Sequence, residues 1–308
     1  MSESKIVAED FPINVFVAQT TTARVAYGES YLHWLRALDG VPDIRTFTST
    51  VRERLFKEIA DNPVRWEGPP PVDPACFDRN ANDQDSADLG LDPRTLWAVL
   101  SARSSRHEQY AVRYLASIGR YDAADPDHPQ TYIDVQEHYH ARILEELLRT
   151  LGLEPRWRPP PALGRFMLRQ IVRLPPWLSD MSVLCGELVG VAVFSLLREH
   201  AGRLFAEQPT ACARIERLLD LILLDEIGHV YYLRSRLGQG RLWLCRLALP
   251  LIARVLMADM PEGARLFGYK PLLDRILHPE VLRWLPEGQG GMPLWLEAKG
   301  VGGGVLPA

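Results

Sequence analysis

Residues 218–233 read LLDLILLDEIGHVYYL, an apolar stretch that contains Glu226 and His229. Apolar residues recur at helical spacing, which predicts a long, largely buried helix over about 210–237. Residues three apart lie on the same side of a helix, so the carboxylate and the imidazole point the same way. Their face is otherwise apolar, with Ile215, Leu219, Ile222, Val230, Leu233 and Leu237. Because a buried carboxylate is costly unless it is paired or metal-bound, this pair predicts an internal polar or metal site.

The Glu-x-x-His pattern occurs a second time, at Glu137 and His140. The spacing again predicts a helix, over about 130–151, and the pair again falls on its apolar side. That side also carries Ile133, Leu144, Leu148 and Leu151. A Glu and a His placed in this way can bind one metal ion together, and the second carboxylate oxygen is then free for a neighbouring ion.

Two further glutamates lie on predicted helices, each one helix before a Glu-x-x-His pattern. Glu187 lies inside VLCGELVGVAVFSLL, residues 183–197, where no other charge is present, so no solvated helix face explains it. The alternative is an unpaired buried acid, which is costly. Glu108 lies on the apolar side of a helix predicted over about 92–117, and a surface ion pair is the alternative for this residue.

Four long helices are predicted in the middle of the chain. They span about 92–117, 130–151, 179–200 and 210–237. Proline- and glycine-containing breaks separate them, and Asp92 followed by Pro93 is typical of a helix start. The sequence therefore predicts an all-α fold with a four-helix bundle over residues 92–240.

The two ends of the chain are expected to surround this bundle. Residues 1–91 form an N-terminal wrapping segment and linker, with one amphipathic helix near 49–60 and a loop rich in Pro, Asp and Asn after it. Residues 241–308 form a C-terminal helical extension with a flexible tail. Its helices are expected near 242–257, 272–277 and 281–285.

In chain order the candidate residues are Glu, Glu-x-x-His, Glu, Glu-x-x-His. A pair of helices that carries a Glu on the first helix and Glu-x-x-His on the second therefore occurs twice. Over about 92–237 this pattern resembles the ferritin-like di-iron carboxylate oxygenase superfamily. The resemblance implies a ferritin-like four-helix bundle with additional N- and C-terminal helices. It also implies two metal ions, with Glu137 and Glu226 bridging them and taking part in O2 activation. The implied ligands are Glu108, Glu137, His140, Glu187, Glu226 and His229.

Residues beside these ligands extend the resemblance. Asp225 is expected to accept the proton of the His140 imidazole, and Gln136 is expected to serve His229 in the same way. For both residues, a place on the polar helix face without such a bond is the alternative. Three glycines beside the ligands leave room for dioxygen or substrate, or else permit close helix packing. They are Gly186, Gly190 and Gly228.

The activity implied by the resemblance is that of a non-haem di-iron oxygenase, which uses O2 to hydroxylate, desaturate or N-oxygenate a small organic substrate. Carboxylate-rich coordination suits two Fe ions, with Mn as the alternative. Aromatic residues expected near the pocket favour an apolar or aromatic substrate: Trp97, Phe194 and Tyr232. Because the chain has neither a Gly-x-Gly-x-x-Gly fingerprint nor a cysteine cluster, electrons are expected from a separate ferredoxin or reductase.

At some positions this sequence differs from known members of the superfamily, and the differences limit which members it can resemble in function. Ferritins are much shorter than this chain. Radical-generating ribonucleotide reductase subunits carry a tyrosine where this chain has Leu144, which excludes a tyrosyl radical there. Arylamine N-oxygenases carry an additional histidine where it has Ile222, which favours hydroxylation or desaturation. The alternative to an enzyme is a metal-free or storage-type helical bundle that acts as a binding or structural protein.

Composition limits the partners of the 308-residue chain. Its 35 Lys and Arg against 39 Asp and Glu give a net charge of −4, which argues against a nucleic-acid partner. Four separated cysteines and an N-terminus without an apolar signal run predict the cytoplasm. Residues 242–257 are the most membrane-like stretch, but Arg246, Pro250 and Arg254 interrupt them. A buried helix is expected there and a membrane is not an expected partner; a membrane-touching helix or a homodimer contact is the alternative.

Overall fold

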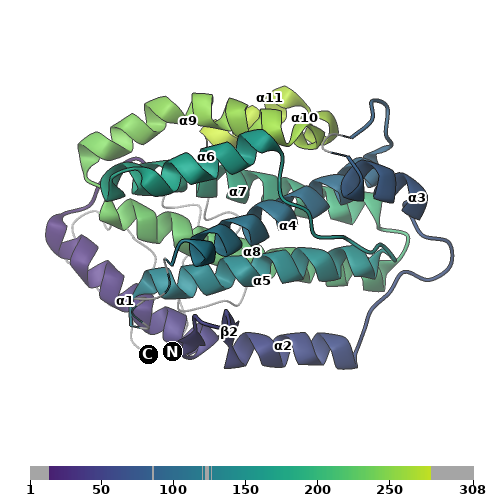
Figure 1. Ribbon diagram of the computed structural model, residues 1–308, viewed down its shortest axis with the longest axis horizontal. Helices are drawn as coiled ribbons and strands as arrows, with labels where there is room; N and C mark the ends of the chain where they lie inside the picture. The colour runs from purple at the N-terminus through teal and green to yellow at the C-terminus, as the bar shows by residue number, and fades with distance from the viewer. Residues whose placement is uncertain (1–13, 85–86, 120, 122–124, 126, 279–308) are drawn as a thin grey trace, which may run out of the picture.

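The computed structural model describes residues 14–84, 87–119, 121, 125 and 127–278 (Figure 1). This part of the chain is predominantly helical. Its strands are one short antiparallel pair, β1 (Pro42–Asp43) and β2 (Thr48–Ser49), in which Pro42 lies opposite Ser49. The predicted all-α class is confirmed for these residues. The helix predicted near 281–285 and the predicted flexible tail lie outside the described residues.

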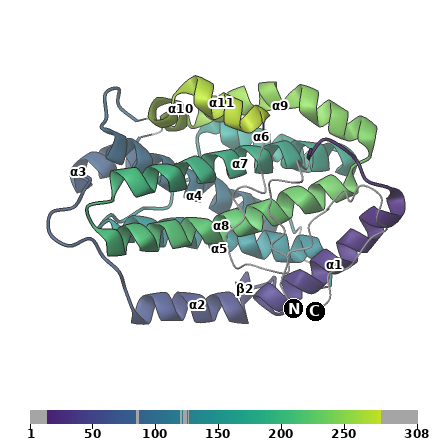
Figure 2. The same cartoon turned by 180° about the vertical axis from the view of Figure 1, so that it is seen from behind.

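Four long helices form the centre of the molecule. They are α4 (Pro93–Ser117), α5 (Pro129–Thr150), α7 (Pro176–Leu204) and α8 (Pro209–Arg236). α4 packs along α5, α7 packs along α8, and α5 also packs on α8, so two helical hairpins lie side by side (Figures 1 and 2). Each predicted range agrees with its helix to within a few residues at both ends.

The starts of these helices follow from local chemistry. Proline occupies the first turn of each, where the amide it lacks would have no partner within the helix. At α4 the Asp92 carboxylate accepts hydrogen bonds from the amides of Arg94 at 2.9 Å and Thr95 at 3.2 Å, as predicted. At α5, Nδ1 of His128 accepts one from the Gln130 amide at 3.2 Å. Because the first residue of each helix is fixed in this way, the position of the candidate Glu and His residues along each helix is fixed as well.

The N-terminal segment covers one side of the central helices. α1 (Thr21–Asp39) packs on α8 and α5, and α2 (Thr50–Asp61) follows it at the predicted position. α1 was not predicted; its buried face is mainly aromatic, and aromatic residues are weak helix formers. The buried residues of α1 are Tyr27, Tyr31, Trp34, Leu35 and Asp39. Within the predicted loop, the chain forms the short helices α3 (Pro74–Phe77) and η2 (Asp78–Asn82).

Another side of the molecule, along the upper edge of Figure 1, is covered by shorter helices. They are α6 (Ala162–Arg173), α9 (Gln239–Asp259), α10 (Pro261–Phe267) and α11 (Tyr269–Leu277). α9 and α11 match predicted helices, whereas α6 was not predicted, because it is short and lies between two proline runs. The buried helix expected at 242–257 is buried on one side only, since α9 packs on α7 and exposes its other side.

One cluster of buried apolar side chains extends from Val15 to Ile276. The segments on both sides of the central helices therefore share a core with them. Among the described helices, α7 alone is long and apolar enough to cross a membrane, but 67% of its most apolar window is buried inside the protein. The apolar character of α7 is thus used for packing against its neighbours.

Candidate metal centre

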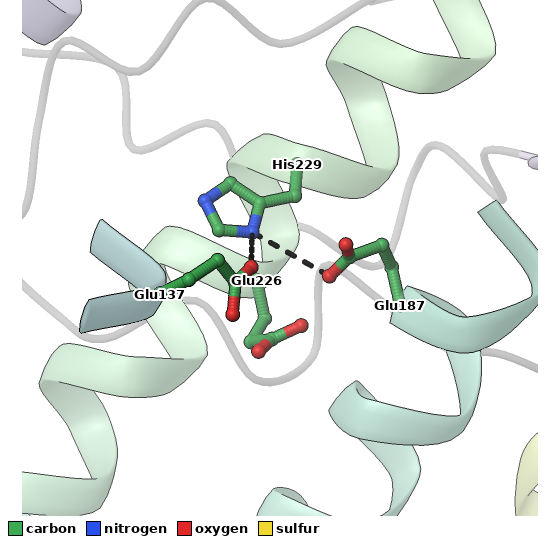
Figure 3. A group of neighbouring side chains, drawn as sticks. All are labelled: Glu137, Glu187, Glu226 and His229. Atoms are coloured by element: carbon green, nitrogen blue, oxygen red, sulfur yellow. Dashed lines mark ion pairs between the residues drawn. The ribbon is translucent and has the colours of Figure 1, made fainter. Parts of the chain in front are cut away.

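Carboxylate and imidazole side chains converge between the four central helices. Glu108 comes from α4 and Glu187 from α7, while α5 and α8 each give a Glu and a His three residues apart. Two groups of these side chains have ligand atoms within 4.8 Å of one another. The groups are Glu137, Glu187, Glu226 and His229 (Figure 3), and Glu108, Glu137 and His140. All six predicted ligand residues are brought together, and Glu137 belongs to both groups.

Glu137 lies between the two imidazoles. Its Oε1 atom is 3.1 Å from Nδ1 of His229, and its Oε2 atom is 3.5 Å from Nδ1 of His140. Glu226 places Oε1 3.4 Å from Nδ1 of His140, and Glu187 places Oε2 3.4 Å from Nδ1 of His229. The imidazole centroids are 5.7 Å apart. Each Nδ1 atom is therefore faced by two carboxylates, and one carboxylate faces both.

The site is largely buried, but two of its glutamates remain partly exposed to solvent. His140, His229 and Glu226 are buried, whereas the side chains of Glu137 and Glu187 keep exposed fractions of 15% and 12%. Both Nδ1 atoms and Oε2 of Glu226 lack a hydrogen bond of acceptable geometry among the described residues. Such buried polar atoms are costly, and a bound cation would satisfy all three. These carboxylate and imidazole groups could hold a metal ion.

The Nε2 atom of each imidazole, which points away from the glutamates, contacts a buried polar side chain outside the ligand set. Nε2 of His140 is 3.1 Å from Oδ2 of Asp225, and Nε2 of His229 is 2.9 Å from Oε1 of Gln136. Both contacts are those that the resemblance implies. A proton on Nε2, donated to these oxygens, leaves the Nδ1 lone pair available to a cation.

Two buried residues outside the predicted site, Asp39 and Arg52, connect these contacts. Arg52 donates from Nε to Asp39 at 2.5 Å and from Nη2 to Asp225 at 2.7 Å. Gln136 donates from Nε2 to the other oxygen of Asp39 at 2.8 Å. A hydrogen-bonded path therefore joins the two imidazoles. In order, it runs through His140, Asp225, Arg52, Asp39, Gln136 and His229.

The N-terminal helices thus contribute directly to the site. Asp39 is the last residue of α1, and Arg52 lies in the first turn of α2, whose start is capped by Ser49. Arg52 shares the buried side of α2 with Ile59. An arginine on the apolar side of an amphipathic helix is the signal that sequence reasoning missed, since a buried guanidinium needs an acidic partner.

Two of the three glycines beside the ligands make room for polar side chains. A Cβ atom on Gly190 would lie 3.0 Å from Oε2 of Glu226, and one on Gly228 would lie 2.7 Å from the Tyr31 hydroxyl. At Gly186 the corresponding position has no described atom within 4 Å apart from the neighbouring backbone of its own helix. Of the two roles predicted for these glycines, close packing therefore applies at Gly190 and Gly228.

The pKa values of the carboxylic acids diverge. Burial, followed by the charge of Glu137, raises the pKa of Glu108 well above its ordinary value. Burial and the charges of Glu226 and Glu137 do the same to the pKa of Glu187. Burial also opposes ionisation of Glu137, but its close contacts with Glu108 and both imidazoles outweigh this effect and hold that pKa well below its ordinary value.

The imidazoles hold their protons strongly when no cation is bound. Burial alone lowers the pKa of a histidine, but the surrounding carboxylates reverse this effect. Contacts with Asp225 and the site glutamates raise the pKa of His140 well above 6.5, and contacts with Glu137 and Glu187 raise the pKa of His229 to about 10. A divalent cation at this site therefore has to displace protons.

The aromatic residues expected near a substrate pocket have other surroundings. Trp97 and Phe194 are buried in the core, where the Trp97 indole donates to the Leu197 carbonyl at 2.9 Å. Tyr232 stacks on Tyr31 and lines a surface pocket of about 400 Å³ together with His128. Trp97 and Phe194 therefore serve packing.

The chain matches no family model, and neither a curated protein nor a solved structure matches it. Its class is accordingly defined by its own geometry. It is a predominantly helical protein whose central helices bring Glu and His side chains into a cluster that could hold a metal ion.

Replacing Arg52 by Met tests the path between the imidazoles. The substitution leaves Asp39 and Asp225 buried without their cation, so we expect the free energy of unfolding to fall by about 3–5 kcal/mol. Chemical unfolding of the metal-free protein measures the change. Arg54→Met, at an exposed position of the same helix, is the control and should change it by less than about 0.5 kcal/mol. Equal effects of the two substitutions would show that the buried path contributes nothing to stability.

The metal-free protein should become less stable as the pH rises from 6.5 to 9.5. His140 and His229 have raised pKa values in the folded state, so the folded protein holds more protons than the unfolded chain in this range. Each such proton contributes a slope of up to about 1.4 kcal/mol per pH unit, and the stabilisation is lost towards the folded-state pKa. Glu108 and Glu187 also have raised pKa values and act in the same direction, whereas Glu137 has a lowered pKa and contributes only in acid.

Thermal unfolding of chelator-treated protein at several pH values measures this dependence. His229→Gln should make it weaker, whereas His278→Gln, at an exposed position, should leave it unchanged. A melting temperature that is constant or rises over this pH range would contradict the assignment of protons to the imidazoles.

Proposed function

We propose that this protein is a non-haem di-iron oxygenase, which uses O2 to oxidise a small organic substrate. One observation carries the proposal: Glu137 faces both imidazoles, Glu226 faces the imidazole of His140, and the outer nitrogen of each imidazole is held by another residue. A Glu from each of two helices and Glu-x-x-His from each of the other two is the ligand set of ferritin-like di-iron and di-manganese proteins. The fold and the donor set support membership of that superfamily.

Two ions fit the arrangement better than one. The two oxygens of Glu137 approach different imidazoles, at 3.1 and 3.5 Å. Glu108 belongs to the group around His140, and Glu187 to the group around His229. We therefore assign His140 and Glu108 to one ion and His229 and Glu187 to the other. Glu137 and Glu226 would contact both ions.

Charge supports the same stoichiometry. Burial raises the pKa values of Glu108 and Glu187, and repulsion from the neighbouring glutamates raises them further. Two divalent ions supply four positive charges and balance the four carboxylates. Oxygen and imidazole-nitrogen donors without thiolate suit iron or manganese, and we propose iron.

When bound, the iron pair would supply the activation of O2 and the oxidation of the substrate. The residues of the chain hold and orient the centre. Asp225 and Gln136 fix the rotation of the two imidazoles, and Arg52 keeps the Asp225 carboxylate ionised against the effect of burial. The partly exposed edge formed by Glu137 and Glu187 is where a small molecule would reach the centre.

The reaction needs partners that the chain does not provide. Insertion of one oxygen atom into a C–H or N–H bond consumes O2, two electrons and two protons, and releases one water. We propose that a separate ferredoxin or reductase supplies the electrons, because the sequence carries no dinucleotide fingerprint and no cysteine cluster. The substrate is a small organic molecule.

Metal analysis tests the proposal. Protein expressed with added iron should contain about two iron ions per chain, and Glu187→Ala should lose one or both while the helical circular dichroism signal is kept. Glu207→Ala, in an exposed ion pair with Arg94, is the matched control and should retain both ions. Loaded, reduced protein should then consume O2, and with ¹⁸O2 a hydroxylated product should carry the label.

Near-zero iron and manganese in the wild-type protein would overturn the proposal. That result would leave a metal-free helical bundle with a buried polar network, which acts as a binding or structural protein. Iron that is bound and oxidised without turnover of any organic substrate would instead indicate storage.

A further inference from the structure

Large apolar side chains are exposed on two neighbouring helices, α6 and α9, and on the first turn of α7. We define the α6–α9 face by six of these residues: Leu163, Phe166, Trp177, Trp243, Leu247 and Leu251. Their exposed fractions run from 42% at Leu163 and Trp177 to 66% at Leu251. α6 and α9 are in contact and lie together along one edge of the molecule in both views (Figures 1 and 2). Such a gathering of exposed apolar residues is characteristic of an interaction site.

α9 carries apolar side chains on two opposite sides, one buried and one exposed. Trp243, Leu247 and Leu251 are four residues apart and form one exposed line. The opposite side is buried against the core through Leu242, Cys245, Leu249, Ala253 and Met257. The buried side fixes α9 on the protein, so α9 can lie along an apolar surface but cannot insert across one.

The charged side chains of α6 and α9 that are exposed or partly exposed are all basic. α6 contains no Asp or Glu, and the single acid of α9, Asp259, is buried and pairs with His107. Asp180, near Trp177, pairs with Arg236. The two helices carry Arg165, Arg169, Arg173, Arg241, Arg246 and Arg254. This local basic character contrasts with the net charge of −4 of the whole chain.

We propose that the α6–α9 face docks the protein on an anionic phospholipid surface. Tryptophan is favoured at the boundary between lipid headgroups and acyl chains, leucine and phenylalanine enter the acyl region, and arginine pairs with lipid phosphates. The same face is poorly suited to a symmetric dimer. A two-fold interface brings the same patch of both copies together and would oppose arginines to arginines. This inference does not depend on the metal centre, and it revises the expectation that a membrane is not a partner.

Vesicle flotation with the full chain tests the proposal. The protein should float with vesicles of phosphatidylcholine and phosphatidylglycerol and bind pure phosphatidylcholine vesicles about tenfold more weakly. Phe166→Ser combined with Leu251→Ser should reduce binding to the anionic vesicles about tenfold or more, because both side chains leave the acyl region. Val25→Ser, at a 61% exposed position of α1, is the matched control and should bind like the wild type.

A charge variant separates the two contributions. Arg246→Gln with Arg254→Gln should lose most of the preference for anionic vesicles, and high salt should do the same to the wild-type protein. All substituted positions are exposed, so circular dichroism spectra and melting temperatures should match those of the wild type.

Three results would overturn the proposal. One is equal flotation of wild type and the Phe166→Ser, Leu251→Ser variant. Another is a wild-type dimer in light scattering that this variant abolishes, which would assign the face to a second copy of the chain. The third is protection of Trp243 from hydroxyl-radical labelling in the lipid-free monomer, which would show that other residues of the chain, such as 279–308, cover the face.

Discussion

The structure depends on the electrostatic balance of four carboxylates and two imidazoles inside an apolar bundle. Glu108, Glu137, Glu187 and Glu226 lie too close together to ionise together without compensating positive charge. Protons provide that compensation in the metal-free protein, and divalent cations would provide it in the loaded one. The same residues therefore link the stability of the bundle, its pH dependence and the affinity that the site would have for a metal ion.

This balance extends into the N-terminal helices. Arg52 lies between Asp39 and Asp225, so one guanidinium serves two buried carboxylates and, through them, both histidines. We therefore expect its removal to affect the orientation of the imidazoles as well as the packing of α2. The segment before the central helices is therefore part of the site. α6 and α9 lie on another side of the molecule and expose apolar side chains to solvent.

The central helices and the six inward side chains could be predicted because they depend on local signals. Proline and Asp92 mark the helix starts, and two Glu-x-x-His pairs on apolar faces identify the buried polar positions. Asp39 and Arg52 could not be found in this way. Arg52 and Asp225 are 173 positions apart, and only tertiary packing brings them together. α1 was not predicted because its buried face is aromatic. The exposed side of α9 was not predicted because hydropathy does not distinguish an apolar side chain that packs in the core from one that is exposed to solvent.

In the proposed centre, Glu137 and Glu226 bridge two iron ions between the helical hairpins. Anomalous diffraction at the iron edge, from crystals of the iron-loaded protein, tests this arrangement most directly. We expect two peaks about 3.5–4 Å apart, one beside His140 and Glu108 and the other beside His229 and Glu187. The absence of an iron peak within coordination distance of Glu137 and Glu226 in fully loaded crystals would contradict it.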